Sequence, residues 1–455
     1  MSEVGTIEPP AAADVAPPPR QSVRDLVASL GIDTRLAGMV SALLVIWLGF
    51  HALSEGKFIT ARNLWNLSVQ STSIGIMATG MVLIIVTRNI DLSVGSLLGL
   101  LGYTMALFQT DGVLSVFGVN VSLGITGTHS YTWILALLIG GLLGALIGLI
   151  QGYIVAYVGV PAFIVTLSGF LAWRGLIFRT GGKQGQTLAP LDANFRYLGG
   201  APERSLGETK SWIVALVVCA GIVVSALLAR RRRDRYELAQ RPKWLEAAMA
   251  AAGCAVVLAA VWLIAVGYDS PVSGQPVGIA YPVLILILVM LGMTYLAKRR
   301  RFGRYVYAYG GNPEAAELGG INTRRTITLT YALMGVLCAI SAAIQTARLN
   351  SATTNLGVQN ELDVIAAAVI GGTSFSGGIG TIPGAVLGAV VMQSLRSGMS
   401  LLNIDSPTQD IVVGIVLVTA VAVDALIRQR RRTTVIGALA AGVALAAIVI
   451  QTGRP

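Results

Sequence analysis

Long apolar segments alternate with short polar ones along most of the chain. The apolar segments cover residues 36–53, 64–87, 92–109, 131–158, 162–178, 212–229, 245–266, 279–297, 326–347, 362–370, 382–402, 411–427 and 435–450. Because a helix needs about 17–25 apolar residues to cross a bilayer, most of these are long enough or nearly so, whereas 362–370 is too short to span alone. The pattern predicts an all-α, polytopic integral membrane protein with about 10–12 transmembrane helices.

The amino-acid composition also indicates a membrane location. Hydrophobic residues make up 54% of the chain and charged residues only 12%, against about a quarter charged in soluble domains. The formal net charge of +11 could suggest nucleic-acid binding. However, the basic residues lie beside the ends of apolar segments, where the positive-inside rule accounts for them. We therefore expect membrane lipid around the chain and no nucleic acid.

The basic clusters predict an orientation. If the amino terminus is cytoplasmic and 362–375 counts as one crossing, the clusters at 230–243, 298–325 and 428–432 all lie on the cytoplasmic side. Residues 1–35 contain several prolines and no apolar core of a signal peptide, which predicts a flexible cytoplasmic tail. On the outer side, the loop at 180–211 is long enough to form a folded cap.

A weak internal repeat suggests two related halves. The sequence Asn-Leu-Ser-Val-Gln-Ser at 66–71 recurs as Asn-Leu-Gly-Val-Gln-Asn at 355–360, and 94–99 resembles 379–384. Coincidence in a chain rich in Leu, Gly, Ser and Val is the alternative. Repeats in transporters place a solute path between the halves near mid-membrane. The membrane domain 36–428 then divides into about 36–180 (first half), 212–297 (inserted spans), 298–325 (polar loop) and 326–428 (second half), followed by 429–455, a basic segment with one further apolar segment.

A polar island at 309–321 separates two long apolar segments. Asn312 can cap a helix, Pro313 suits the first helical position, and Glu314 lies where the helix dipole favours negative charge. Gly319 and Gly320 can end that helix. About two turns long, it is too short and too polar to cross the bilayer, so it should lie on the cytoplasmic surface and present a compact contact to a soluble partner.

Several motifs together resemble one transporter family. Glu314-Ala-Ala followed by Gly319 resembles the EAA coupling loop of permease subunits in ATP-binding-cassette (ABC) importers, while 89–95 and 377–384 resemble segments of ribose/xylose-type sugar permeases. The likeness covers roughly 36–428, and the inserted spans favour the xylose-type subgroup. The ATPase-coupling residues that the resemblance implies are Asn312, Pro313, Glu314, Ala315, Ala316, Gly319 and Gly320.

The same resemblance implies a function and a set of partners. The expected function is movement of a monosaccharide, a xylose-like pentose, across the bacterial inner membrane. The expected partners are an ABC ATPase subunit on the cytoplasmic face, a periplasmic sugar-binding protein and a second permease copy in a homodimer. A branched-chain amino acid ABC permease and an ion-coupled secondary transporter are the alternatives. The latter should carry several intramembrane carboxylates or histidines, and Asp91 is nearly alone.

Two polar breaks in apolar segments are candidates for the substrate path. A carboxylate such as Asp91 costs at least about 2.5–3.5 kcal/mol inside hydrocarbon, so it must meet water, a partner or a cavity. One interpretation is a broken helix that lines the path, and the other is a helix cap with no transport role. In the second half, the glycine-rich segment 371–384 could form a gate or merely allow close helix packing. The path residues proposed from the two breaks are Asn89, Asp91, Ser93, Gly95, Gly372, Ser374, Ser376 and Gly378.

Other charged residues receive weaker predictions. Arg174 lies in an apolar segment and could pair with a carboxylate such as Asp91 or extend toward the interface. Gln359, Glu361 and Asp363 are expected at the outer mouth, where they would either be solvated or contact a docked receptor.

No catalytic motif is found. The nearest match to a phosphate-binding loop, Gly-Gly-Lys-Gln at 181–184, lacks the upstream glycine and the hydroxyl. The three cysteines lie in apolar segments without metal spacing. We expect a transport subunit with no cofactor and no metal of its own, with ATP used by the partner subunit.

Overall fold

The computed structural model describes residues 34–116, 119–122, 131–180, 187–236, 242–263 and 267–428. Most of the expected amino-terminal tail, the Gly-Gly-Lys-Gln segment and the last apolar segment lie outside these ranges. Within them, seven helices are long and apolar enough to cross a membrane, and α4 and α14 add apolar helices of 18 and 20 residues. The fold is that of a polytopic helical membrane protein, as predicted.

The helices follow the predicted apolar segments closely. In the first half they are α2 (Thr34–Leu53), α3 (Ala61–Val86), α4 (Val94–Asp111), α5 (Thr132–Tyr153, continued by a π turn at Ile154–Val158) and α6 (Ala162–Thr180). The later helices are α7 (Gly207–Arg235), α8 (Lys243–Val261), α9 (Tyr281–Arg299), α10 (Arg301–Gly311), α11 (Pro313–Leu318), α12 (Thr323–Leu349), α13 (Asn360–Ile370), α14 (Ile382–Leu401) and α15 (Ser406–Arg428).

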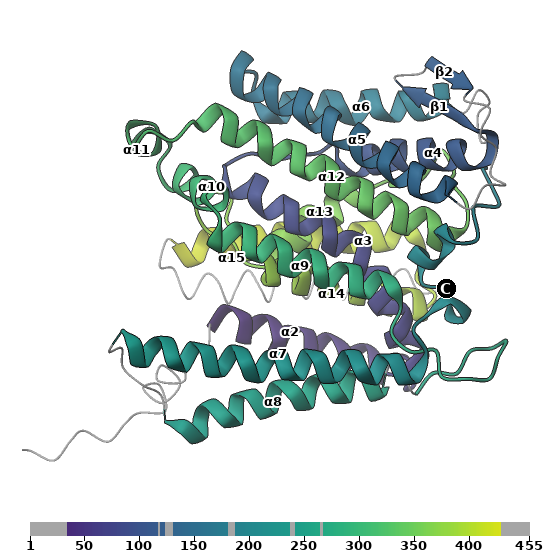
Figure 1. Ribbon diagram of the computed structural model, residues 1–455, viewed down its shortest axis with the longest axis vertical. Helices are drawn as coiled ribbons and strands as arrows, with labels where there is room; N and C mark the ends of the chain where they lie inside the picture. Colours follow the sequence, from purple (N-terminus) through teal and green to yellow (C-terminus); the bar gives the residue numbers. More distant parts are fainter. Residues whose placement is uncertain are drawn as a thin grey trace, which may run out of the picture.

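The long helices run roughly side by side around a buried centre (Figure 1). From Leu64 onward α3 is buried on nearly all its faces, and it packs against α12, α13 and α14. A helix that is apolar all round belongs in the middle of a bundle. Because α3 belongs to the predicted first half and α12, α13 and α14 to the second, helices of both surround the centre.

Close backbone contact joins α5 to α12. A Cβ atom on Gly335 of α12 would lie 1.9 Å from the carbonyl oxygen of Gly144 on α5. Only glycine fits there, and small residues of this kind let membrane helices approach without any polar attraction. Helix α6 follows the π turn at the end of α5 and lies on the outer side of α5 (Figure 1).

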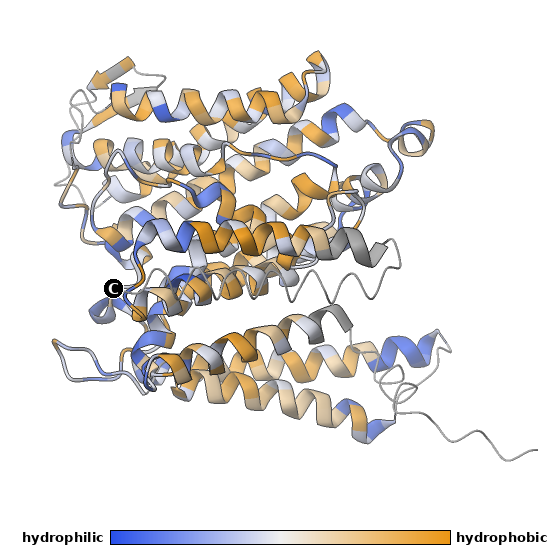
Figure 2. Ribbon diagram, turned by 180° about the vertical axis from the view of Figure 1, so that it is seen from behind, coloured by the Kyte–Doolittle hydropathy of each residue, from blue (hydrophilic) through white to orange (hydrophobic). Residues whose placement is uncertain are grey.

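At the opposite edge, α7 and α8 form a peripheral pair with α2 (Figure 1). Their apolar side chains face outward, including Leu216 at 62% and Val256 at 69% exposure. Figure 2 shows apolar residues along these helices and hydrophilic residues gathered toward their ends. Exposed apolar faces of this length suit lipid rather than water. α7 and α8 cover most of the segment 212–297 that the sequence predicted as inserted spans, whereas α9, at the end of that segment, packs against α3.

The two polar breaks singled out in the sequence both separate consecutive helices. Residues 87–93 separate α3 from α4, and 371–381 separate α13 from α14. The short apolar segment at 362–370 is the helix α13, which has only 11 residues.

Two described segments outside the long helices also have ordered structure. A small antiparallel hairpin, β1 (Val113–Val116) with β2 (Val119–Ser122), follows α4 and was not predicted from the sequence. Residues 187–206 contain two 3-10 turns, Phe195–Gly199 and Pro202–Arg204; the first packs on α12, and Leu188 pairs with Ala352, just beyond the end of α12. The described part of the expected outer cap is therefore folded.

Candidate functional site

The predicted surface helix is α11, at the far left of Figure 1. The side chain of Asn312 accepts a hydrogen bond from the backbone N–H of Ala315 at 3.1 Å, and Pro313 is the first helical residue. The helix ends where Gly319 N–H donates to the carbonyl of Ala315, and Gly320 has a φ of +79°. The predicted cap, the first proline and the glycine end of this helix are therefore observed.

One side chain at the tip of α11 was missed. Leu318 is 90% exposed, beside the exposed Glu314 and Glu317, while Ala316 is buried against the protein. A large apolar residue so exposed on a polar surface is typical of a protein contact. The available signal was a leucine inside an otherwise polar island.

The short helix α10 fastens α11 to both helix breaks. Arg88, in the first break, donates from Nε to the carbonyl of Gly310 at 3.0 Å and from Nη2 to the carbonyl of Gly311 at 2.9 Å. Tyr307 donates its hydroxyl to the carbonyl of Gly380, in the second break, at 2.8 Å. We call this group of contacts around the end of α10 the clasp.

The two breaks also contact each other at the clasp. The N–H of Gly378 donates to the carbonyl of Val86 at 3.0 Å. A Cβ atom on Gly310 would lie 1.9 Å from that same carbonyl oxygen, so the three segments meet at backbone distance. Burial raises the pKa of Tyr307 to about 12, which keeps its hydroxyl protonated as a donor at cellular pH.

The remaining path candidates of the second break lie beside the clasp. Ser374 and Ser376 share a hydrogen bond of 2.9 Å between their hydroxyls, and Gly372 has a φ of +85°. In the first break, Asn89 donates to the hydroxyl of Thr87 at 3.0 Å. These polar groups are occupied by local bonds in this conformation.

Asp91 also lies in the first break, and its side chain is buried. Its Oδ1 accepts hydrogen bonds from the N–H and the hydroxyl of Ser93 at 2.8 and 2.6 Å. Gln151 of α5 donates to the same hydroxyl at 3.0 Å. Only 1% of Asp91 is exposed, so the carboxylate acts as a turn-forming acceptor at the start of α4 here. A role in the path stays a prediction.

Arg174 does not pair with Asp91. Its Nη1 donates to the carbonyl of Leu356 at 3.2 Å. Gly95, next along α4, lies against the start of α13, where a Cβ would approach the carboxylate of Glu361. The expectation that Glu361 and Asp363 are solvated was also wrong, since they are 7% and 3% exposed.

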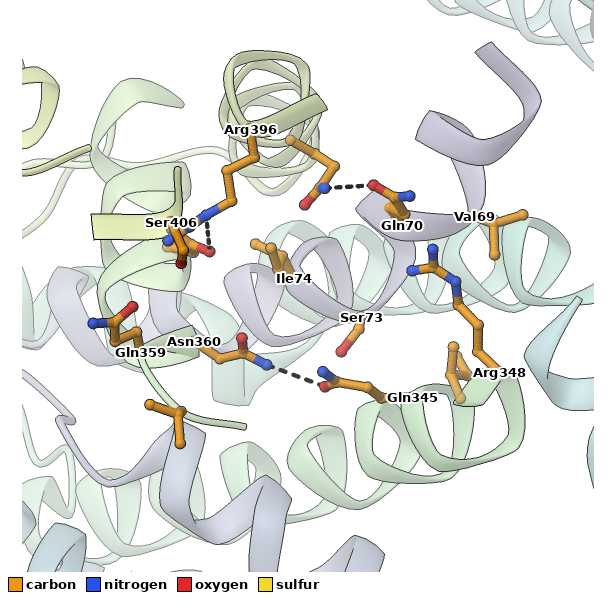
Figure 3. A pocket seen from close by; sticks show the side chains of 14 residues that line it. Val69, Gln70, Ser73, Ile74, Gln345, Arg348, Gln359, Asn360, Arg396 and Ser406 are labelled. Carbon is orange, nitrogen blue, oxygen red and sulfur yellow. Dashed lines mark hydrogen bonds and ion pairs between the residues drawn. The ribbon is translucent and has the colours of Figure 1, made fainter. Parts of the chain in front are cut away.

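A polar cavity of about 440 Å³ lies toward the other end of the bundle (Figure 3). It is lined at the last turns of α12 by Gln345 and Arg348, whereas α11 precedes the first turn of α12, and α12 is 27 residues long. At 1.5 Å per residue, about 40 Å separate the two ends. The other lining residues are Val69, Gln70, Ser73, Ile74, Ile344, Val358, Gln359, Asn360, Asp363, Gln393, Arg396 and Ser406.

An ion-pair network closes one wall of the cavity. Arg396 holds both carboxylate oxygens of Asp363 at 2.9 Å and also pairs with Asp410 at 3.3 Å. Two nearly parallel bonds of this kind fix α14 against α13. Of these lining residues, the sequence singled out only Gln359 and Asp363. The cavity itself could not be predicted, because its lining residues come from segments far apart in the chain.

Comparison with known proteins agrees with this architecture. Residues 63–421 match the family described as branched-chain amino acid transport system / permease component. The chain belongs to this family. As a permease component it is a multi-pass membrane transport subunit and not an enzyme, which confirms the prediction of a transport role.

Individual relatives in the permease family are similar over most of their length. The chain is 37% identical to the xylose transport system permease protein XylH of Escherichia coli K12, over 86% of this chain and 92% of that protein. It is 36% identical to XylH of Haemophilus influenzae, over 85% and 95%. It is 33% identical to the ribose import permease RbsC of Escherichia coli K12, over 84% and 91%. No solved structure matches the chain.

Proposed function

We propose that this chain is the inner-membrane permease subunit of an ABC importer that moves a monosaccharide, a pentose resembling xylose. The support is its similarity to two xylose permeases and one ribose permease over at least 84% of its length. The family model alone would equally allow an amino acid as the substrate.

The observation that carries the mechanism is the clasp. An exposed surface helix is fixed through α10 to both helix breaks by the bonds of Arg88 and Tyr307. A soluble ATPase that binds α11 and moves on ATP binding would displace both breaks together, because packed elements transmit motion as rigid bodies. ATP is then used by that partner, and this chain needs no cofactor.

The other partners follow from this assignment. A periplasmic sugar-binding protein would deliver the sugar at the end of the bundle that carries the polar cavity. A second permease copy would complete a homodimer, and lipid would cover the exposed faces of α7 and α8. In this arrangement the amino terminus and α11 are cytoplasmic.

Two alternative functions predict different chemistry. A branched-chain amino acid needs groups for both its charged ends and an apolar pocket for its side chain. The cavity offers mainly amides, and the two arginines beside it are balanced by Asp363 and Asp410. An ion-coupled transporter needs a titrating group with access to water, whereas Asp91 is enclosed and hydrogen-bonded.

The test is uptake of labelled D-xylose by a bacterium that lacks its own xylose importers and carries this chain with its ATPase and binding-protein partners. Uptake should appear and should stop when ATP is depleted while the proton gradient is kept. Uptake that persists under those conditions would indicate a secondary transporter. Uptake of leucine in place of xylose would indicate an amino acid permease.

A further inference from the structure

One buried hydroxyl in the polar cavity has no protein partner. Ser73 of α3 lines the cavity and is only 8% exposed. Its Oγ makes no hydrogen bond with any residue that the structure describes, although other buried hydroxyls of α3, such as those of Ser71 and Thr72, bond to the carbonyls of Leu67 and Val69. Figure 3 shows the Ser73 side chain directed toward the space between the walls. A buried polar group without a partner is costly, so a ligand is its natural complement.

Four amides from four helices surround this hydroxyl in two hydrogen-bonded pairs. Gln393 of α14 donates to Gln70 of α3 at 2.7 Å, and Asn360 of α13 donates to Gln345 of α12 at 3.1 Å. Each pair joins one wall of the cavity to another (Figure 3). An amide offers two donors and an acceptor with two lone pairs, so most of its capacity stays available after one such bond.

The charges around the cavity favour an uncharged ligand. Arg396 is neutralised by Asp363 and Asp410. Arg348 also lines the cavity, and within the described part of the chain it has no ion pair or side-chain hydrogen bond. Figure 3 shows its guanidinium beside Gln70. This guanidinium can donate to a hydroxyl oxygen. The two positive charges of the arginines and the two negative charges of the carboxylates sum to zero.

We propose that this cavity is a transit site for a neutral polyhydroxy solute, in which the hydroxyl of Ser73, the amides of Gln70 and Gln393, and the guanidinium of Arg348 bind hydroxyl groups. This inference rests on the proposed function and adds the residues that recognise the sugar inside the membrane domain. The volume of about 440 Å³ lies within the range of about 300–1,000 Å³ typical of small-molecule sites.

The same lining makes the binding weak. Among the described residues that line the cavity there is no aromatic ring on which a sugar could stack. A solute in transit must bind favourably enough to enter and loosely enough to leave. The site therefore holds a sugar with a dissociation constant in the millimolar range, roughly 1–100 mM.

Protection of an introduced thiol tests occupancy directly. Val358 lines the cavity at 47% exposure and contributes no polar group, so Val358→Cys leaves the amides intact. Val272→Cys, at 77% exposure in the loop before α9, is the matched control outside the cavity. Both are made in a chain whose three native cysteines are replaced by alanine, and alkylation is followed in membrane vesicles.

D-xylose at four times the dissociation constant, about 4–400 mM for the range given above, should slow alkylation of the Val358→Cys chain by about fivefold and leave the Val272→Cys chain unchanged. L-leucine should protect neither. Equal alkylation rates with and without xylose in a chain whose parent imports xylose would overturn the transit site. Protection by leucine would overturn the assignment to a neutral polyhydroxy solute. Absence of xylose import by the parent would instead refute the proposed function.

A second measurement uses the orphan hydroxyl. Ser73→Ala removes no protein hydrogen bond, so the fold should be unaffected, while Ser68→Ala on the same helix removes a bond to Trp65 and serves as the control. In the reconstituted importer, Ser73→Ala should lower the sugar moved per ATP hydrolysed by about fivefold, the factor of one net hydrogen bond. The ATPase rate should stay the same. An unchanged ratio would contradict the role of Ser73.

Discussion

At the scale of single residues, the clasp depends on atoms that have no room to move. The carbonyl oxygen of Val86 accepts from Gly378 N–H while the α-carbon of Gly310 lies against it. Arg88 then covers the end of α10 with two bonds to the carbonyls of Gly310 and Gly311. Neighbouring glycines in the same helix therefore have very different tolerance to substitution.

Gly310→Ala should damage the clasp and Gly311→Ala should not. The new Cβ at residue 310 would lie 1.9 Å from Val86 O, whereas at residue 311 it would meet nothing within 4 Å. Overpacking of this kind costs about 1–3 kcal/mol of stability. Thermal unfolding in detergent and sugar uptake should both fall for Gly310→Ala alone. Equal behaviour of the two variants would show that the segments separate easily.

Tyr307→Phe should weaken the link from α10 to the second break. Loss of the bond to Gly380 should destabilise the protein by about 1 kcal/mol and lower uptake per ATP. Tyr305→Phe, at a more exposed tyrosine of the same helix, is the control. Because burial raises the pKa of Tyr307 to about 12, its contribution to stability is present below about pH 10 and is lost as pH rises through 12. Thermal unfolding of the wild type and of both variants between pH 7 and pH 11 measures this contribution. A stability difference between the wild type and Tyr307→Phe that grows with pH would contradict the role given to the Tyr307 hydroxyl.

At the scale of elements, features that depend on residues close together in the sequence could be predicted, whereas features that depend on distant residues could not. The cap, the first proline and the terminal glycines of α11 act within a few residues, so capping rules predicted that helix from Asn312 to Gly320. The polar cavity could not be found in this way. Its Gln70–Gln393 pair joins residues 323 positions apart, and a glutamine in an apolar helix carries no signal of which neighbour it will meet.

Asp91 illustrates the same limit at a helix break. The sequence left a path residue and a helix cap as equal interpretations. In the structure, Asp91 accepts from Ser93, two residues away, and Gln151, 58 residues beyond that, bonds to the same hydroxyl. The nearby partner was visible in the sequence, but the enclosure by α5 was not. The role of a charged or polar residue in a membrane domain can be assigned only when the residues packed around it are known.

The element α11 should bind its soluble partner mainly through Leu318. Truncating a central, exposed apolar anchor commonly costs about 2 kcal/mol or more of binding. Leu318→Ala should therefore reduce recovery of the ATPase subunit with the purified permease, with membrane insertion unchanged. Leu349→Ala, which is 55% exposed at the far end of α12, is the matched control. If both variants retain the ATPase equally, the contact lies elsewhere.

At the scale of the whole molecule, the two functional regions lie at opposite ends of the same long helices. α11 and the clasp precede the first turn of α12, and the polar cavity lies at its last turns. The breaks between α3 and α4 and between α13 and α14 belong to the clasp, at the end of the bundle that carries α11. A signal that enters at α11 therefore reaches the breaks before it reaches the cavity, which fits an importer driven from the cytoplasm.

This arrangement requires a definite sidedness, which labelling can test. Glu314→Cys on α11 should react with a membrane-impermeant thiol reagent only in inverted vesicles, and Val272→Cys in the loop before α9 only in intact cells stripped of their outer membrane. Both side chains are exposed, so accessibility to the reagent does not differ between them. The basic residues at 298–304 lie beside α11, and the positive-inside rule assigns that end to the cytoplasm. Reaction of the residue-314 thiol from outside would reverse the orientation and remove the ATPase from α11.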